Sequence, residues 1–225
     1  MIIVQKSKPK ACHLEHLRLQ MIQNQLKPLS IQNEDILSAF ESVQREHFLP
    51  KEHEHLAYHD QLIHFSKNRT MLPPITIAKI LNAIDLKSIQ KALVIGCGLG
   101  YTVSILNKLN ISTLGIDHSV HINAALKKHP KFKSFLKSAP LIQGDDENAP
   151  FDLIFIEGGV ESVPITLIKQ LKDSGYLAAL IFKGKHLPLT ATIFKKQENV
   201  LSPIYSFESN GSLLNEFSNT QTFEF

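Results

Sequence analysis

The sequence of 225 residues predicts an α/β protein built on a doubly wound, mostly parallel sheet, with an antiparallel hairpin at one edge and a helical cap at its N-terminal end. Three observations lead to this prediction. A short apolar run, residues 92–95, is followed at once by a glycine-rich turn and a helical pattern. Further apolar runs, typical of strands buried on both faces, alternate with helical segments. Two β-rich runs, 190–196 and 203–207, then close the fold.

The composition is typical of a globular protein, with 43% hydrophobic and 20% charged residues. The net charge of +3 is too small, and the basic groups too scattered, to predict a nucleic-acid partner. No apolar run approaches the ~20 residues of a membrane span, and residues 1–4 are too short for a signal-peptide core. The two cysteines, Cys12 and Cys97, favour a reducing compartment. We expect a cytoplasmic protein without membrane or nucleic-acid partners, and the sequence leaves its oligomeric state open.

The chain is expected to form one compact unit in two parts. Residues 1–85 predict an N-terminal arm and helical cap, and residues 86–225 predict a sheet domain with a C-terminal tail. After a loose arm of about twelve residues, a helix is expected over 13–26. A second helix begins after Asn33, whose side chain can cap it, and a short helical segment is expected at 51–57.

Histidines are frequent in the cap, and His53, His55 and His59 lie close together in the sequence. Side chains two positions apart on a helix point to different faces, and no cysteine or paired carboxylate completes a ligand set. We therefore predict no metal site. The polar segment 65–72 is expected to be a loop, leading into a helix whose first turn holds Pro74.

Three glycines, Gly96, Gly98 and Gly100, stand at every second position after the first apolar run. Glycine permits a tight turn and close approach of a ligand, and the helix that follows offers free N–H groups at its N-terminus. Dinucleotide sites have the spacing G-x-G-x-x-G, with the third glycine where Tyr101 stands. The spacing G-x-G-x-G resembles instead the first motif of S-adenosylmethionine-dependent methyltransferases. A glycine turn can also merely join a strand to a helix.

The next expected strand, 113–117, ends in Asp117, about 20 positions after the first glycine. An acid at this spacing can accept hydrogen bonds from ribose hydroxyls, and it can equally cap the following helix. Helical segments are expected at 120–128 and 131–137, and a third strand at 140–143.

Two more acids follow later strands. Asp145 comes after the third expected strand, where acids that contact adenine often lie, and Glu157 follows the fourth, 151–156. A fifth strand is expected at 176–182 after a helix. The tail, 215–225, carries three phenylalanines, which dock on the body or on a partner.

Several short segments of the chain together match one pattern: Met21–Leu26, Val43–Pro50, Ala57–Asp60, Val94–Tyr101, Gly144–Asp145, Pro150–Asp152 and Val163–Leu171. Over about residues 14–185 the chain resembles the protein-L-isoaspartate O-methyltransferase family. The runs Arg-Glu-x-Phe-x-Pro and Ala-Tyr-x-Asp are fairly specific in combination and mark the helical cap of that family.

The resemblance implies a Rossmann-like methyltransferase sheet, S-adenosyl-L-methionine as methyl donor, and isoaspartyl residues of damaged proteins as acceptor. Methyl transfer to a carboxylate needs no strong base, because the acceptor is ionised at neutral pH, so the protein mainly supplies alignment. Thr70 is the residue expected at the acceptor. The residues expected at the donor are Gly96, Cys97, Gly98, Gly100, Tyr101, Asp117, His118, Asp145 and Glu157.

Two positions depart from the family pattern. Leu72 stands where the family has a serine, and Val94 stands where it has an acid that helps hold the methionine end of the donor. Arg69 could hold the acceptor carboxylate, although an ordinary surface ion pair is the commoner role of such a residue. Two alternatives therefore stay open: a methyltransferase of a different acceptor, and a nucleotide-binding or scaffold module without catalysis.

Overall fold

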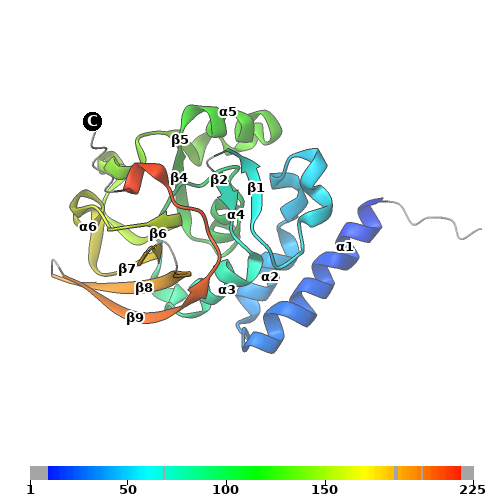
Figure 1. The fold of residues 1–225 in the computed structure, drawn as a ribbon, viewed down its shortest axis with the longest axis horizontal. Helices are drawn as coiled ribbons and strands as arrows, with labels where there is room; N and C mark the ends of the chain where they lie inside the picture. The colour runs from blue at the N-terminus through cyan, green and yellow to red at the C-terminus, as the bar shows by residue number, and fades with distance from the viewer. Residues whose placement is uncertain (1–9, 68, 185–186, 199, 219–225) are drawn as a thin grey trace, which may run out of the picture.

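The computed structural model, shown in Figure 1, describes residues 10–67, 69–184, 187–198 and 200–218. Its main sheet has seven strands in the order β5-β4-β3-β6-β7-β8-β9. Neighbouring strands from β5 to β7 are parallel, whereas β8 is antiparallel to both β7 and β9. This confirms the doubly wound sheet with an antiparallel edge hairpin. The strands are β3 (Lys91–Ile95), β4 (Ser112–Asp117), β5 (Leu136–Ser138), β6 (Phe151–Val160), β7 (Leu171–Ile181), β8 (Leu189–Gln197) and β9 (Val200–Ser209).

Alternate residues of the central strands enter two different apolar clusters. On β3, Ala92 and Val94 face the cluster formed with the N-terminal segments, whereas Leu93 and Ile95 face the cluster that contains the C-terminal residues Leu214 and Phe217. Buried parallel strands carry apolar residues on both faces because helices or other segments cover each side. The helices are α1 (Lys10–Met21), α2 (Glu34–Ser42), α3 (Pro74–Asn82), α4 (Tyr101–Lys108), α5 (Ser119–Lys128) and α6 (Ile165–Gln170).

The N-terminal helical segments pack against the sheet and share one of its two apolar clusters, so the division at residue 85 stays a prediction. The first helix begins at Lys10, earlier than expected, and continues through shorter turns to Leu29. Asn33 caps α2 as predicted, since its Oδ1 accepts hydrogen bonds from the N–H groups of Asp35 and Ile36 at 3.0 and 3.3 Å.

Three sequence predictions about local structure are wrong. The segment expected to be a loop forms an antiparallel hairpin of β1 (Ile63–Ser66) and β2 (Arg69–Met71). In place of the helix expected at 131–137, Pro130–Ser134 forms a short 3-10 turn and the last residues belong to β5. In place of the strand expected at 140–143, Leu141–Gln143 forms another 3-10 turn. Strand β5 contains a lysine and a serine, so its pairing with β4, and not its own pattern, determines its structure.

None of the helices in the described part of the chain has the length and apolar character that a membrane span requires. Within the same residues, no group of three or more potential ligands could hold a metal ion.

Candidate functional site

The glycine turn lies where β3 ends, beside the end of β6. The chain runs from β3 outward to β5 and then returns to β6 on the other side, so the sheet reverses its order between β3 and β6. Ligands of doubly wound sheets bind outside the strand ends at such a reversal. Gly96, Gly98 and Gly100 have φ angles of +71°, +52° and +90°, which L side chains rarely adopt. The turn therefore requires glycine at all three positions.

Asp117 holds this turn in place. Its carboxylate is fully buried and accepts hydrogen bonds from the N–H groups of Gly98 and His118, at 2.9 and 2.7 Å. The Nε atom of Arg69 lies 3.2 and 3.3 Å from its two oxygens. A carboxylate has about four acceptor sites, and these contacts use them. The predicted ribose acceptor is thus already paired within the chain.

Arg69 is 2% exposed and makes ion pairs on two sides. Besides Asp117, its Nη2 atom donates to Oε1 of Glu216 at 2.8 Å, and Nε2 of His118 contacts the same oxygen. The expectation of an ordinary surface pair for Arg69 is therefore wrong. Partial burial alone would raise the pKa of Glu216, but the hydrogen bond from Arg69 outweighs it and lowers that pKa to about 2.

Residues 212–217, which we call the C-terminal strap, lie across the ends of β3 and β6. Figure 1 shows the strap in red, returning from β9 to lie beside β4. The N–H of Gly159 donates to the carbonyl of Ser212 at 2.8 Å, and the N–H of Leu214 donates to the carbonyl of Gly159 at 2.9 Å. Leu214 fills the space left by two glycines, since a Cβ at Gly158 would lie 2.6 Å from its Cγ and one at Gly96 3.3 Å from its Cδ1.

The β1–β2 hairpin covers the glycine turn from a second direction. A Cβ at Gly98 would lie 2.5 Å from Cζ of Phe65, so the aromatic ring rests directly on the glycine. Thr70, expected at the acceptor, is buried on β2 beside Arg69 and pairs with His64 of β1. Phe217, one of the three tail phenylalanines, docks on the body and is 5% exposed, whereas Phe223 and Phe225 lie outside the described residues.

A second polar cluster lies inside the protein, on the other side of the glycine turn. Arg45 is fully buried, donates from Nη2 to the carbonyl of Leu72 at 2.7 Å, and lies over the ring of Tyr101 at 4.7 Å. Its Nε and Nη1 atoms and Oε2 of Glu157 are buried without a hydrogen-bond partner among the described residues. Burial raises the pKa of Glu157 to about 8, although the Thr102 side chain and the nearby positive charge of Arg45 oppose this.

Sequence reasoning did not identify Arg45 as a site residue. It stands in the Arg-Glu-x-Phe-x-Pro run, and the match of that run to the family pattern was the signal available. Tyr101 contacts Arg45 and the aromatic rings of Phe40 and Phe48, so its side chain points into the apolar core and not toward the strap.

Two predicted donor residues have other surroundings. Asp145 accepts hydrogen bonds from Nζ of Lys137 and Nδ2 of Asn148, both at 2.6 Å. Burial opposes the ionised form, but these bonds outweigh it and lower the pKa of Asp145. Neither of these partners belongs to the glycine turn. Cys97 is buried with its Sγ atom beneath Gly115, and burial raises the pKa of its thiol.

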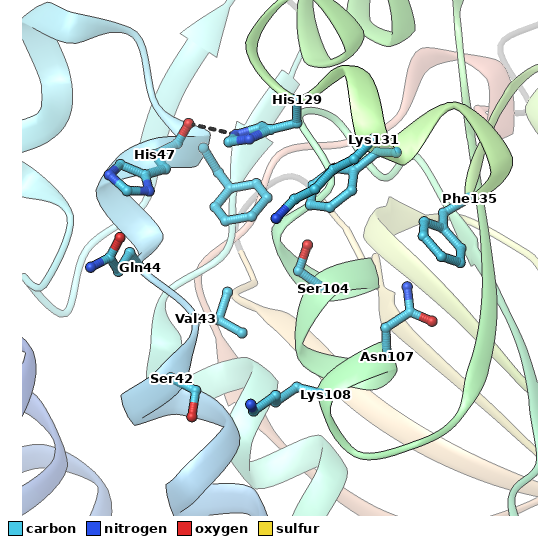
Figure 2. Close-up of a pocket in the computed structure, with 12 residues that line it drawn as sticks. Ser42, Val43, Gln44, His47, Ser104, Asn107, Lys108, His129, Lys131 and Phe135 are labelled. Atoms are coloured by element: carbon cyan, nitrogen blue, oxygen red, sulfur yellow. Dashed lines mark hydrogen bonds between the residues drawn. The ribbon is translucent and has the colours of Figure 1, made fainter.

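A surface hollow of about 390 Å³ lies elsewhere, between the end of α2 and the exposed side of α4. Figure 2 shows Ser104 and Asn107 on one side and Val43 and His47 on the other. None of the predicted donor residues lines it. At the glycine turn, by contrast, the strap and the hairpin fill the space that a ligand would need.

Comparisons with known proteins agree with this fold. Residues 17–205 match the family Protein-L-isoaspartate(D-aspartate) O-methyltransferase (PCMT). The chain is 30% identical to a protein-L-isoaspartate O-methyltransferase of Aliivibrio fischeri strain MJ11 over 83% of this chain and 91% of that one. It is 32% identical to protein-L-isoaspartate O-methyltransferase 2 of Marinobacter nauticus over 73% and 77%.

Solved structures show the same architecture. A protein-L-isoaspartate O-methyltransferase aligns with a TM-score of 0.74 at 23% identity, covering 87% of this chain, which in turn spans 65% of that longer chain. A putative protein-L-isoaspartate O-methyltransferase from Plasmodium falciparum, in complex with S-adenosyl-L-homocysteine, aligns with a TM-score of 0.68 at 18% identity, covering 88% and 97%. On the family match and the curated relatives, this chain belongs to the protein-L-isoaspartate O-methyltransferase family.

Proposed function

We propose that this protein is an S-adenosylmethionine-dependent O-methyltransferase that methylates isoaspartyl residues of damaged proteins, and that it acts in the cytoplasm. Membership of the family supports this function. The observation that carries it is a pair of buried, oppositely charged side chains beside the glycine turn, Arg45 and Glu157, which keep polar atoms without a hydrogen-bond partner among the described residues.

The donor fits this pair chemically. Its methionine end carries an ammonium group and a carboxylate, and unpaired buried polar groups are costly unless a ligand satisfies them. Glu157 would accept the ammonium group through Oε2, and Arg45 would donate to the carboxylate through Nε and Nη1. Arg45 and Glu157 would then hold the methionine end of the donor although Val94 stands where the family pattern has an acid. S-adenosylmethionine supplies a methyl group on a sulfonium centre.

The other donor residues stay predictions. Gly96 and Gly98 would present backbone to the ligand, and Asp117 would accept hydrogen bonds from ribose hydroxyls after Arg69 has released it. Asp145 would contact the adenine. The further residues predicted at the donor are Cys97, Gly100, Tyr101 and His118.

At the acceptor, the chain has to orient a carboxylate. The attacking carboxylate oxygen forms a bond to the methyl carbon as the carbon–sulfur bond breaks, and no proton is transferred. Thr70 is the proposed orienting hydroxyl. Leu72 is fully buried, and its hydrocarbon side chain cannot form a hydrogen bond with the acceptor. Its backbone carbonyl accepts a hydrogen bond from Arg45.

Methyl incorporation into a matched pair of peptides tests the function. One peptide contains isoaspartate and the other aspartate at the same position, and both are incubated with the protein and labelled S-adenosylmethionine. We expect label in the isoaspartyl peptide only, and at least a tenfold lower rate for Arg45→Gln. Donor binding without label in either peptide would instead favour a different acceptor.

A further inference from the structure

The strap contacts two of the residues predicted to bind the donor and reaches a third, Asp117, through Arg69. Leu214 packs on Gly96, and Glu216 contacts His118 and the guanidinium of Arg69, which itself lies on Asp117. A donor placed at the glycine turn and a strap placed as it is here would therefore overlap.

We propose that Arg69 and His118 form a carboxylate-binding site at the edge of the donor site, and that Glu216 fills it from within the chain until the donor displaces the strap and an acceptor carboxylate takes the place of Glu216. This inference rests on the proposed function and names the group that holds the carboxylate of the acceptor peptide.

The first support is the imperfect fit of the internal carboxylate. Oε1 of Glu216 receives both the Arg69 and the His118 contacts, whereas its Oε2 atom is buried without a hydrogen-bond partner among the described residues. A guanidinium can bind both oxygens of a well-oriented carboxylate. An acceptor carboxylate free to adjust its position could therefore form a more complete set of hydrogen bonds than Glu216 does.

The second support is the position of Arg69 between two carboxylates. When ribose hydroxyls take the acceptor sites of Asp117, Arg69 loses its contact with that residue. Once the strap has left as well, Arg69 has lost both of these carboxylates, and a guanidinium that is 2% exposed favours another one in their place. Binding of the donor thus prepares Arg69 to hold a second carboxylate, which is the group that accepts the methyl.

The third support is that the backbone of the strap is fixed at the end of β6. Besides the ion pair of Glu216 and the buried side chains of Leu214 and Phe217, two backbone hydrogen bonds to Gly159 hold it there. It also follows an exposed residue, Asn210, near the end of the chain. A short segment of this kind can open locally at a lower free-energy cost than unfolding of the whole protein, so a ligand that binds the open form can displace it.

The experiment compares the full chain with Glu216→Gln and with Glu208→Gln, a matched change of an exposed carboxylate on β9. Calorimetric titration with S-adenosylhomocysteine should give a dissociation constant about threefold to tenfold lower for Glu216→Gln than for the unchanged protein. Glu208→Gln should bind like the unchanged protein. With the isoaspartyl peptide, Glu216→Gln should lower KM and leave kcat unchanged.

Hydrogen exchange supplies an independent readout. Addition of S-adenosylhomocysteine should speed exchange at the N–H of Leu214, because the strap leaves Gly159. Slower exchange there would show that the strap closes over the donor, and it would overturn the inference, as would equal affinity of Glu216→Gln and the unchanged protein. If no variant binds S-adenosylhomocysteine at millimolar concentration, the proposed function fails together with the inference.

Discussion

The two sides of the glycine turn differ in how their buried charges are paired. On the outer side, Asp117, Arg69 and Glu216 form a continuous set of ion pairs supplied entirely by the chain. On the inner side, Arg45 and Glu157 keep buried atoms without hydrogen-bond partners among the described residues. A ligand must compete with existing contacts on the outer side, whereas on the inner side it supplies missing ones.

This difference indicates where binding free energy for a donor arises. Hydrogen bonds that replace existing ones contribute little, but satisfying an unpaired buried group removes a penalty of about 1–3 kcal/mol. The inner cluster should therefore dominate donor affinity, and the outer set should control access and the fit of the acceptor. The following predictions test the two sides separately.

The largest effect is expected for Asp117→Asn. The change leaves Arg69 with a less favourable buried partner and places an amide group near the N–H groups of Gly98 and His118. We expect a loss of about 3 kcal/mol in the free energy of unfolding, because Arg69 keeps its buried positive charge and loses one of its two carboxylate partners. Urea denaturation measures this loss.

A double-mutant cycle with Arg69→Gln provides the control. Removing both charges should cost less than the sum of the two single changes, because neither side chain then stays buried after losing its ion pair with the other. Additive effects would show that Arg69 and Asp117 do not depend on each other.

A gain in stability is expected for Glu157→Gln. The pKa of Glu157 is raised from 4.5 to about 8, so between these values the folded protein retains a proton that the unfolded chain releases. Stability therefore falls as the pH rises through this window. Glutamine removes the effect, and the variant should be more stable at pH 8 by on the order of 3 kcal/mol, with little difference at pH 4.

The matched control for that change is Glu147→Gln, whose side chain is 79% exposed. Thermal unfolding between pH 4 and 8 should show the same pH dependence for this variant as for the unchanged protein. A stability difference between Glu157→Gln and the unchanged protein that does not vary with pH would mean that Glu157 is ionised in the folded protein.

The smallest effect concerns Glu216. Its pKa is lowered from 4.5 to about 2, so its contribution to stability is complete above pH 4.5 and is lost as the pH falls toward 2. At pH 7 we expect Glu216→Gln to unfold with a free energy about 1 kcal/mol lower than the unchanged protein. The difference should vanish near pH 2, and a constant difference down to that pH would argue against the ion pair with Arg69.

Local patterns predicted the elements around the glycine turn well. The turn, the strand that precedes it and the acid that ends β4 are close in sequence. Glycine spacing and apolar runs predict the local structure of such neighbouring residues. The capping of α2 by Asn33 followed for the same reason. Strand β5 was missed because a polar edge strand has no apolar pattern of its own.

The pairing of charged side chains around the glycine turn could not be predicted from local sequence patterns. Arg69 lies on the β1–β2 hairpin and Glu216 in the last described turn. Arg69 contacts Asp117 and Glu216 contacts His118 because the chain returns twice to the same edge of the sheet. Arg45 was likewise assigned to the cap, and its approach to Glu157 depends on packing of the cap against the sheet. Contacts between distant segments leave no periodicity in the sequence.

Calorimetric titration with S-adenosylhomocysteine at pH 7, in two buffers of different protonation enthalpy, tests the central claim most directly. If the ammonium group of the ligand pairs with Glu157, that carboxyl must lose its proton, and micromolar binding should release close to one proton (~0.9, from a pKa of about 8). Glu157→Gln should abolish the release. Absence of binding at millimolar ligand, or binding with the same heat in both buffers, would contradict the account.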